Sequence, residues 1–207
     1  MRPLAFLSLS LLACVAQAAE TKRPNVLFIA VDDLRPEINA SGSNVIKTPN
    51  LDRIAAKGTT FDRAYCQQAV CSPSRSSLMT GRRPDATRVW DLETHFRTAL
   101  PDAVTVAQHF KDHGYHSMSM GKIFHGGFDD PKSWSVPSQY PKSPQYASEA
   151  ALKMQSDPAN IDKKGRARGP AVEDADVPDD TYADGKIARL AVKTLGELKQ
   201  NTKPFFL

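Results

Sequence analysis

The sequence predicts an α/β fold, a sandwich in which helices lie on both sides of a largely parallel central sheet. Three observations predict it. Residues 26–31 form a continuous apolar run, typical of a strand buried on both faces in a parallel sheet. Segments with helical spacing then alternate with short apolar segments. A long amphipathic segment at 182–200 leads into a further apolar run at 204–207. Such alternation is typical of α/β sandwiches.

The elements after the first strand begin with a helix over residues 49–57. Thr48 is its candidate N-cap, Pro49 suits the first turn, and Gly58 follows as the stop. Residues 61–65 alternate in a way that predicts a short strand. The helix and the short strand together continue the alternation that the first strand begins.

Two further helices and a strand occupy the middle of the chain. One helix is predicted to start near Pro73 and to end before Gly81. The next is predicted to run from residue 104 or 105 to 113, where Gly114 ends it. Residues 115–120 alternate with small polar residues and predict another strand.

The last third of the sequence contains a long polar segment. Residues 129–180 are rich in Pro, Asp, Ser and Lys with little periodicity, which predicts a loop-rich excursion or lid. Residues 182–200 have apolar side chains at helical spacing and predict the last helix. Residues 204–207 begin a core strand at which the sequence stops, so we expect a truncated chain.

The N-terminus has the features of an export signal at residues 1–19. Arg2 provides the positive charge, residues 4–15 a short apolar core, and residues 16–18 a small-x-small cleavage site. An imperfect lipidation motif ends at Cys14, so a lipid anchor there is the alternative. We expect an exported protein, periplasmic or extracellular, that meets a membrane only if Cys14 is lipidated.

The amino-acid composition limits the class of protein and the kinds of partner that this chain can have. Of the 207 residues, 41% are hydrophobic and 24% are charged, which is typical of a globular protein. The formal net charge is +4, and Lys and Arg are scattered along the chain. Scattered cations argue against a nucleic-acid partner, while a mild positive excess suits an anionic substrate.

Two adjacent carboxylates, Asp32 and Asp33, follow the first predicted strand directly. Neighbouring side chains of a strand face opposite ways, so both can reach one ion only if the strand ends there. Ligands of open α/β sheets bind beyond the carboxyl ends of the strands. Paired carboxylates suit a hard cation such as calcium or magnesium. The alternative is that both carboxylates lie in solvent at the end of the strand and bind no metal ion.

Cys71 begins the segment Cys71-Ser72-Pro73-Ser74-Arg75, the pattern that precedes conversion of a cysteine to formylglycine. The helix start near Pro73 offers free N–H groups to an anion, and the planar guanidinium of Arg75 suits oxyanions. The alternatives are a buried thiol or a disulfide with Cys66, and a solvated Arg75. If Cys71 is modified, Cys66 is left unpaired, and we expect it to be a buried small apolar residue.

Lys122 and His125 follow the strand predicted at 115–120 and so reach the same edge of the sheet. A lysine can neutralise an anionic oxygen, and a histidine can orient or transfer a proton. The alternative is that both lie on the surface without a role. The remaining histidines have weaker claims and suit packing or solvated roles; they are His95, His109, His113 and His116.

These segments resemble, in order, the motifs of the type I, formylglycine-dependent sulfatases, and within that family most of all the iduronate-2-sulfatase branch. The likeness is strong over residues 24–128 and looser over 178–207. Many arylsulfatases place one residue between the lysine and the histidine, whereas here there are two. The segments that carry the resemblance are 31–36, 67–71 with Pro73 and Arg75, 80–85 and 121–125.

The resemblance implies an alkaline-phosphatase-like fold and a calcium ion held by Asp32, Asp33 and the modified Cys71. It further implies a sulfated carbohydrate as substrate and a formylglycine-generating maturation enzyme as partner. One hydroxyl of the hydrated aldehyde would attack sulfur, and loss of a proton from the other would then expel sulfate. Arg75 and Lys122 would stabilise charge, and His125 would orient or deprotonate the diol.

Family members carry further active-site residues in their second half, and none can be placed in this sequence. The resemblance therefore implies that residues 20–207 are the N-terminal part of a catalytic domain with an incomplete metal site, inactive or poorly folded by itself. Two other functions remain open. One is a phosphatase or phosphodiesterase of the same superfold, and the other is an exported, non-catalytic carbohydrate-binding protein.

Overall fold

The computed structural model describes residues 23–207, so the export signal predicted at 1–19 and the lipid anchor considered at Cys14 lie outside the described residues. None of the helices in the described part has the length and apolar character needed to cross a membrane. The α-helices and strands are α1 Pro49–Ala55, α2 Cys71–Thr80, α3 Pro84–Thr87, α4 Val106–Asp112, β1 His116–Ser117, α5 Glu149–Ser156, α6 Ala183–Leu198 and β2 Phe205–Phe206. The 3₁₀ turns are Asn39–Ser41, Phe96–Thr98, Pro131–Ser133, Pro158–Asn160 and Asp179–Thr181.

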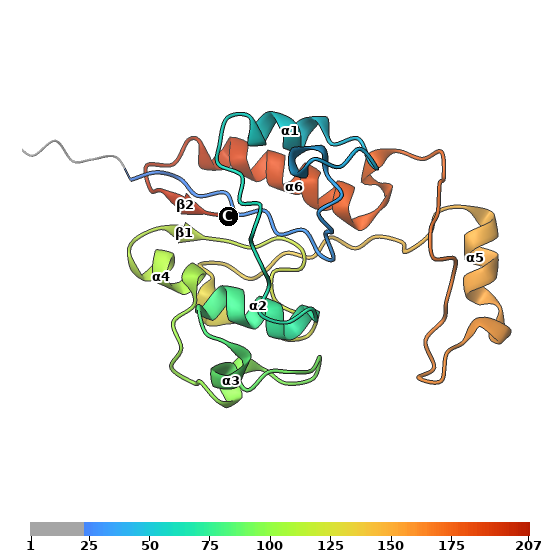
Figure 1. Cartoon of the computed structure of the whole chain (residues 1–207), viewed down its shortest axis with the longest axis horizontal. Helices are drawn as coiled ribbons and strands as arrows, with labels where there is room; N and C mark the ends of the chain where they lie inside the picture. Colours follow the sequence, from blue (N-terminus) through green and yellow to red (C-terminus); the bar gives the residue numbers. More distant parts are fainter. Residues whose placement is uncertain (1–22) are drawn as a thin grey trace, which may run out of the picture.

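A small parallel sheet lies at the centre of the fold (Figure 1). β1 pairs in parallel with β2, His116 opposite Phe205. On the other side of β2, Val26 forms a parallel bridge with Phe206. The chain thus places segments from its beginning, middle and end side by side, and the predicted parallel orientation is confirmed for these three.

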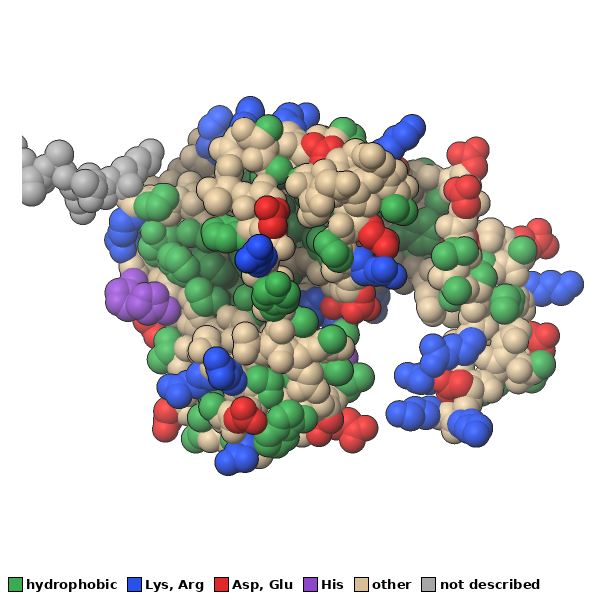
Figure 2. Space-filling model, viewed as in Figure 1, with side chains coloured by type: hydrophobic (Ala, Val, Ile, Leu, Met, Phe, Trp, Pro, Cys, Tyr) green, Lys and Arg blue, Asp and Glu red, His purple; other side chains and the backbone are tan. Residues whose placement is uncertain are grey.

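The strand predicted over residues 26–31 is reduced in the structure to an isolated bridge at Val26, and its predicted burial on both faces is wrong. The backbone pairs with the β2 segment only as far as Phe28, whose N–H donates to the carbonyl of Leu207 (2.7 Å). Beyond that point no strand lies beside it within the described residues, and one face borders an apolar recess with α6 (Figure 2). The exposed fractions on that face are 48% for Leu27, 68% for Ile29 and 54% for Val31.

Two other predicted strands also differ from the structure. Residues 61–65 form a turn rather than a strand, and Phe61 and Tyr65 are exposed, because no other segment of residues 23–207 pairs with them. The strand predicted at 115–120 is reduced to β1, after which Met120 forms a separate parallel bridge with Gln139. Alternation of residue types alone did not reveal which segments have neighbours.

The predicted helices are present, with small shifts at their ends. α2 begins two residues before Pro73, and Gly81 ends it in the left-handed conformation (φ 66°). Thr105 caps α4 by accepting a hydrogen bond from the Gln108 N–H (3.0 Å), as its position before the helix suggests. Thr48 precedes α1 without capping its backbone; its hydroxyl donates to the carboxylate of Asp52 instead (3.1 Å).

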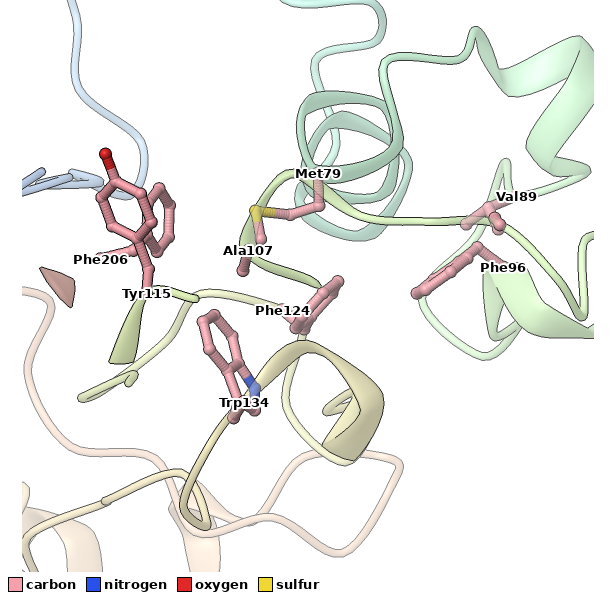
Figure 3. Packing of buried hydrophobic residues seen from close by; sticks show 9 residues of the cluster. Met79, Val89, Phe96, Ala107, Tyr115, Phe124, Trp134 and Phe206 are labelled. Atoms are coloured by element: carbon pink, nitrogen blue, oxygen red, sulfur yellow. The ribbon is translucent and has the colours of Figure 1, made fainter. Parts of the chain in front are cut away.

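Two apolar clusters pack on opposite sides of the sheet, because Phe205 and Phe206 point to opposite faces. One cluster joins the sheet to α6 through Met118, Phe205 and Leu198. In the other, Figure 3 shows Phe124 in the middle, with Phe96 and Trp134 on its two sides at ring-centroid distances of 5.8 and 6.1 Å. The members of this second cluster are Met79, Val89, Phe96, Ala103, Ala107, Tyr115, Phe124, Trp134 and Phe206.

The first part of the polar segment 129–180 packs in the body of the protein, where Asp130, Ser133 and Trp134 are buried, whereas the part that contains α5 leaves the body as an arm (Figure 1). The arm contains α5, a helix that sequence reasoning did not predict. The carboxylate of Glu173 links the two ends of the arm. It accepts hydrogen bonds from the Ser148 hydroxyl (2.6 Å) and the Tyr182 hydroxyl (2.5 Å). The backbone N–H groups of Ala147 and Ser148 donate to the same carboxylate. One acidic side chain thus ties the start of α5 to the start of α6.

This arrangement predicts a loss of stability in acid. Hydrogen bonds from Ser148 and Tyr182 hold the pKa of Glu173 at about 2, below its ordinary 4.5. A lowered pKa contributes stability above pH 4.5 that is lost as the pH falls towards 2. We expect urea unfolding to show a larger fall in stability over this range for the wild type than for Glu173→Gln. Asp174→Asn, which removes the exposed neighbouring carboxylate, should behave as the wild type; an equal fall in all three would contradict the assignment.

Candidate active site

Cys71 lies on the first turn of α2, partly exposed at the end of the helix. Val70 before it is extended (φ −140°), so the chain turns into the helix at Cys71. Pro73 occupies the third helical position, where its missing N–H costs no intrahelical hydrogen bond. Ser72 and Pro73 are buried. The helix start is therefore anchored in the body of the protein, while Cys71 itself stays partly exposed.

Asp32 and Asp33 lie where the N-terminal extended segment ends. Asp33 has a positive φ of 52°, so the backbone turns there instead of continuing as a strand. This turn lets two successive side chains approach one point, which a continuing strand would not allow. Ligand atoms of Asp32, Asp33 and Cys71 all lie within 4.8 Å of one another. The structure thus brings together the three residues that the sequence predicts as a metal site.

Arg75 lies one turn after Cys71 and is buried in the protein. Its Nη2 donates to Oδ1 of Asp32 (2.7 Å) and its Nη1 to the backbone carbonyls of Ile123 (2.9 Å) and Lys122. The planar guanidinium therefore joins α2, the acidic turn and the segment that follows β1. A solvated role, the alternative considered for Arg75, does not fit this position.

Lys122 contacts the same acidic turn, at the other carboxylate oxygen of Asp32. Its Nζ lies 2.5 Å from Oδ2 of Asp32. Burial tends to lower the pKa of Lys122, but the hydrogen bond to Asp32 and the nearby Cys71 sulfur outweigh it, and the pKa is raised. Burial tends to raise the pKa of Asp32, but the hydrogen bonds from Lys122 and Arg75 outweigh this effect, and the pKa is lowered. The pair is thus ionised at neutral pH.

His125 lies near the three charged groups, with Nδ1 buried and without a hydrogen-bond partner among the described residues. Burial lowers the pKa of His125, and the positive charges of Lys122 and Arg75 lower it further against the effect of Asp32. Its ring stacks on Phe128 at 6.2 Å. A lowered pKa favours the neutral imidazole, the form that can accept a proton.

Sequence reasoning missed Tyr140. Burial and the charge of Asp129 raise the pKa of this tyrosine, against the opposing charges of Arg75 and Lys122, so its phenol lies within electrostatic reach of the site. Nothing in the local sequence marks it, because its position depends on the bridge between Met120 and Gln139.

The other cysteine and the remaining histidines lie away from these groups. Cys66 and Cys71 are both unpaired in the described chain, but Cys66 is exposed, so its predicted burial is wrong because no apolar segment covers the turn. His95 accepts a hydrogen bond from the Arg97 N–H (3.0 Å). The rings of His109 and His113 lie 4.1 Å apart, tilted by 35°, at the end of α4, which suits packing rather than metal binding.

Of the three side chains that could bind a metal ion, the two carboxylates suit a hard cation and the thiol does not. Two carboxylates suit calcium, which takes about six to eight oxygen ligands. The sulfur of an unmodified Cys71 is a softer donor that calcium does not favour, whereas an oxygen at this position would complete an all-oxygen face. Around this point the protein presents two cations for an anion, Arg75 and Lys122, and a neutral base, His125.

In the comparison with known proteins, the matching family profile and the individual relatives are all described as sulfatases. A family profile described as Sulfatase matches residues 24–207. The chain is 39% identical to iduronate 2-sulfatase of Mus musculus over 189 residues, 88% of this chain and 33% of that protein. It is 37% identical to iduronate 2-sulfatase of Homo sapiens over 216 residues, 94% and 36% of the two chains. A sulfatase of Formosa agariphila is 45% identical over 124 residues, 54% and 24% of the two. The chain thus spans about a third of the length of the first two relatives.

Proposed function

The chain belongs to the sulfatase family, and from this membership we propose that it carries the nucleophile of a sulfuric ester hydrolase that removes sulfate from a sulfated carbohydrate. The nucleophile would be formylglycine made from Cys71 by a maturation enzyme. We also propose that the parallel sheet and its helices belong to an alkaline-phosphatase-like sandwich. The observation that carries the proposal is the convergence of Asp32, Asp33 and Cys71 within 4.8 Å beside Arg75 and Lys122.

Each side chain has a role that follows from its contacts. Asp32 and Asp33 would hold calcium, which would polarise the sulfate group and stabilise negative charge. When Cys71 is present as formylglycine, its hydrate supplies one hydroxyl to attack sulfur and a second whose deprotonation re-forms the aldehyde and releases sulfate. Lys122, kept protonated by its raised pKa, would bind a sulfate oxygen.

Arg75 and His125 complete the proposed chemistry. Arg75 fixes the carboxylate of Asp32 through one nitrogen and the turn after Gly121 through another, so it orients the groups that bind sulfate. His125 is held neutral by burial and by neighbouring cations and would take the proton of one of the two hydroxyls of the aldehyde hydrate. As the bond between sulfur and the nucleophile forms, the bond between sulfur and the sugar oxygen breaks, and this oxygen takes up a proton and leaves as the sugar alcohol.

A uronate 2-sulfate is the proposed substrate, because two relatives that cover most of this chain are named iduronate 2-sulfatases. The features of residues 1–19 lead us to propose export to the periplasm or the extracellular space, with a lipid anchor at Cys14 as the variant. A phosphatase or phosphodiesterase is disfavoured. Enzymes of that kind use serine or threonine as nucleophile, whereas Cys71 here precedes Pro73 and Arg75.

The test is sulfate release by the whole protein, produced together with a formylglycine-generating enzyme. We expect sulfate to be released from a uronate 2-sulfate disaccharide, and release to stop when a chelator removes calcium and to return when calcium is restored. A phosphomonoester offered at the same concentration should not be hydrolysed. Binding of the disaccharide without release of sulfate, when position 71 carries the aldehyde, would establish a non-catalytic binding protein instead.

A further inference from the structure

One aromatic ring contacts His125 without taking part in the proposed chemistry. Phe128 is partly buried, and its ring stacks on the imidazole of His125 with centroids 6.2 Å apart and planes inclined by 22°. This geometry is typical of offset stacking between aromatic rings. A catalytic imidazole is usually oriented by a hydrogen bond at its second nitrogen. Within residues 23–207, however, Nδ1 of His125 is buried without a partner, so the stack on Phe128 is the contact that orients the ring.

A tight turn holds the rings of His125 and Phe128 together. The Phe128 N–H donates to the carbonyl of His125 (2.9 Å), so the chain reverses over residues 125–128. Gly127 occupies the third position of this turn with a φ of 82°, a left-handed conformation that favours glycine. The turn has only two residues between its ends, and it therefore returns Phe128 to the side chain of His125.

Phe128 is in turn supported by the core of the protein. Its ring lies 6.1 Å from the ring of His95, which stacks on Phe96 at 4.7 Å. Phe96 is buried and stacks on Phe124 at 5.8 Å, and Phe124 directly precedes His125 in the chain. The rings thus form a continuous series from the core to the imidazole of the candidate active site.

A buried ion pair joins the two segments that carry His95 and Phe128. Arg97 donates through Nε and Nη2 to the two carboxylate oxygens of Asp130, at 2.6 and 2.8 Å. Arg97 follows His95 by two residues, and Asp130 follows Phe128 by two. The side chain of Asp130 is only 2% exposed. Because a bidentate pair has a defined geometry, it keeps the segment with Phe128 against the segment with His95.

We propose that Phe128 is a positioning residue, which holds the imidazole of His125 in the orientation from which it takes a proton of the aldehyde hydrate. It acts through His125 rather than on the substrate. The inference rests on the proposed function for what the imidazole does. It goes beyond that function because it gives a role in the reaction to a residue outside the motif at 121–125.

The first measurement needs no turnover. NMR of the whole protein, at a pH at which the histidines are neutral, records the ring-current shift that Phe128 imposes on the imidazole protons of His125. The resonance is assigned by its loss in His125→Gln. We expect Phe128→Ala to move it and Phe128→Tyr to keep it, because tyrosine retains the flat ring. The matched control is Phe61→Ala, which removes a ring that is 78% exposed and should leave the resonance in place.

The second measurement is the rate of sulfate release. Phe128→Ala should lower kcat about tenfold to a hundredfold, because a misdirected base slows the chemical step. The KM should change by less than about twofold, since Phe128 does not contact the substrate. Phe128→Tyr should keep kcat within about threefold of the wild type. Phe128→Leu fills the same space without a flat face, so it should recover less of kcat than Phe128→Tyr.

The background His125→Gln separates positioning from a general structural role. In that background Phe128→Ala should have no further effect on kcat, because no imidazole is left to orient. Equal losses of kcat in the two backgrounds would overturn the proposal, as would a His125 resonance that Phe128→Ala leaves in place. A wild-type protein that shows the predicted resonance shift yet releases no sulfate would refute the proposed hydrolysis and leave the positioning of His125 by Phe128 standing.

Discussion

Replacement of Cys71 by serine is expected to lower sulfate release by the whole protein at least about a thousandfold. Serine offers one hydroxyl, which can accept sulfate from the substrate but has no second hydroxyl to expel it. The enzyme should therefore stop after the first transfer. Cys71 is partly exposed at the start of α2 and serine is nearly the same size, so we expect the substitution to leave the fold unchanged.

The stalled enzyme can be observed directly. Mass spectrometry of the Cys71→Ser protein after exposure to substrate should show a persistent gain of about 80 Da, one sulfate group on serine. Cys66→Ser is the matched control, because this cysteine is exposed, unpaired within residues 23–207 and five residues before the nucleophile. It should keep the wild-type rate and no adduct. Continued turnover by Cys71→Ser would contradict the proposed release step.

Replacement of Arg75 by alanine is expected to destabilise the protein by about 2–4 kcal/mol. The guanidinium is buried and satisfies two backbone carbonyls as well as the carboxylate of Asp32. Without it, these acceptors lose their donor and water reaches them only in part. We expect the loss of stability to lie in the lower half of this range, because the side chain of Asp32 is 37% exposed and water screens its charge.

Urea unfolding of the unmodified chain measures this effect. Arg75→Lys should recover only a fraction of the loss, since one ammonium group cannot reach the carboxylate and both carbonyls at once. Arg82→Ala, which removes an exposed arginine just after α2, should change the free energy of unfolding by less than about 0.5 kcal/mol. Equal stabilities for Arg75→Ala and Arg82→Ala would show that Arg75 does not hold these segments together.

Local sequence predicted the helices and the arrangement of the site well, because their signals are local. Thr105 marks the start of α4, and Gly81 follows the end of α2. The carboxylates after the first apolar run and the lysine after β1 lie at one edge of the parallel sheet, as expected from the carboxyl ends of its strands. Roles in catalysis and metal binding remain predictions for these residues.

The features that sequence did not predict depend on distant neighbours. Residues 26–31 look like a buried strand, but Ile29 is exposed because pairing with the β2 segment ends at Phe28. Phe61 belongs to no strand for the same reason, since no described segment pairs with it. The bridge between Met120 and Gln139 brings Tyr140 within electrostatic reach of the active site. Pairings of this kind leave no pattern within a short window of sequence.

The most direct test of the central claim is the mass of the peptide that carries residue 71, taken from the protein produced with a formylglycine-generating enzyme. We predict a loss of about 18 Da relative to the unmodified peptide, because the aldehyde oxygen replaces sulfur and two hydrogens are lost, one from the thiol and one from Cβ. A peptide that retains the thiol, from a preparation that releases sulfate from sugars at its full rate, would contradict the account.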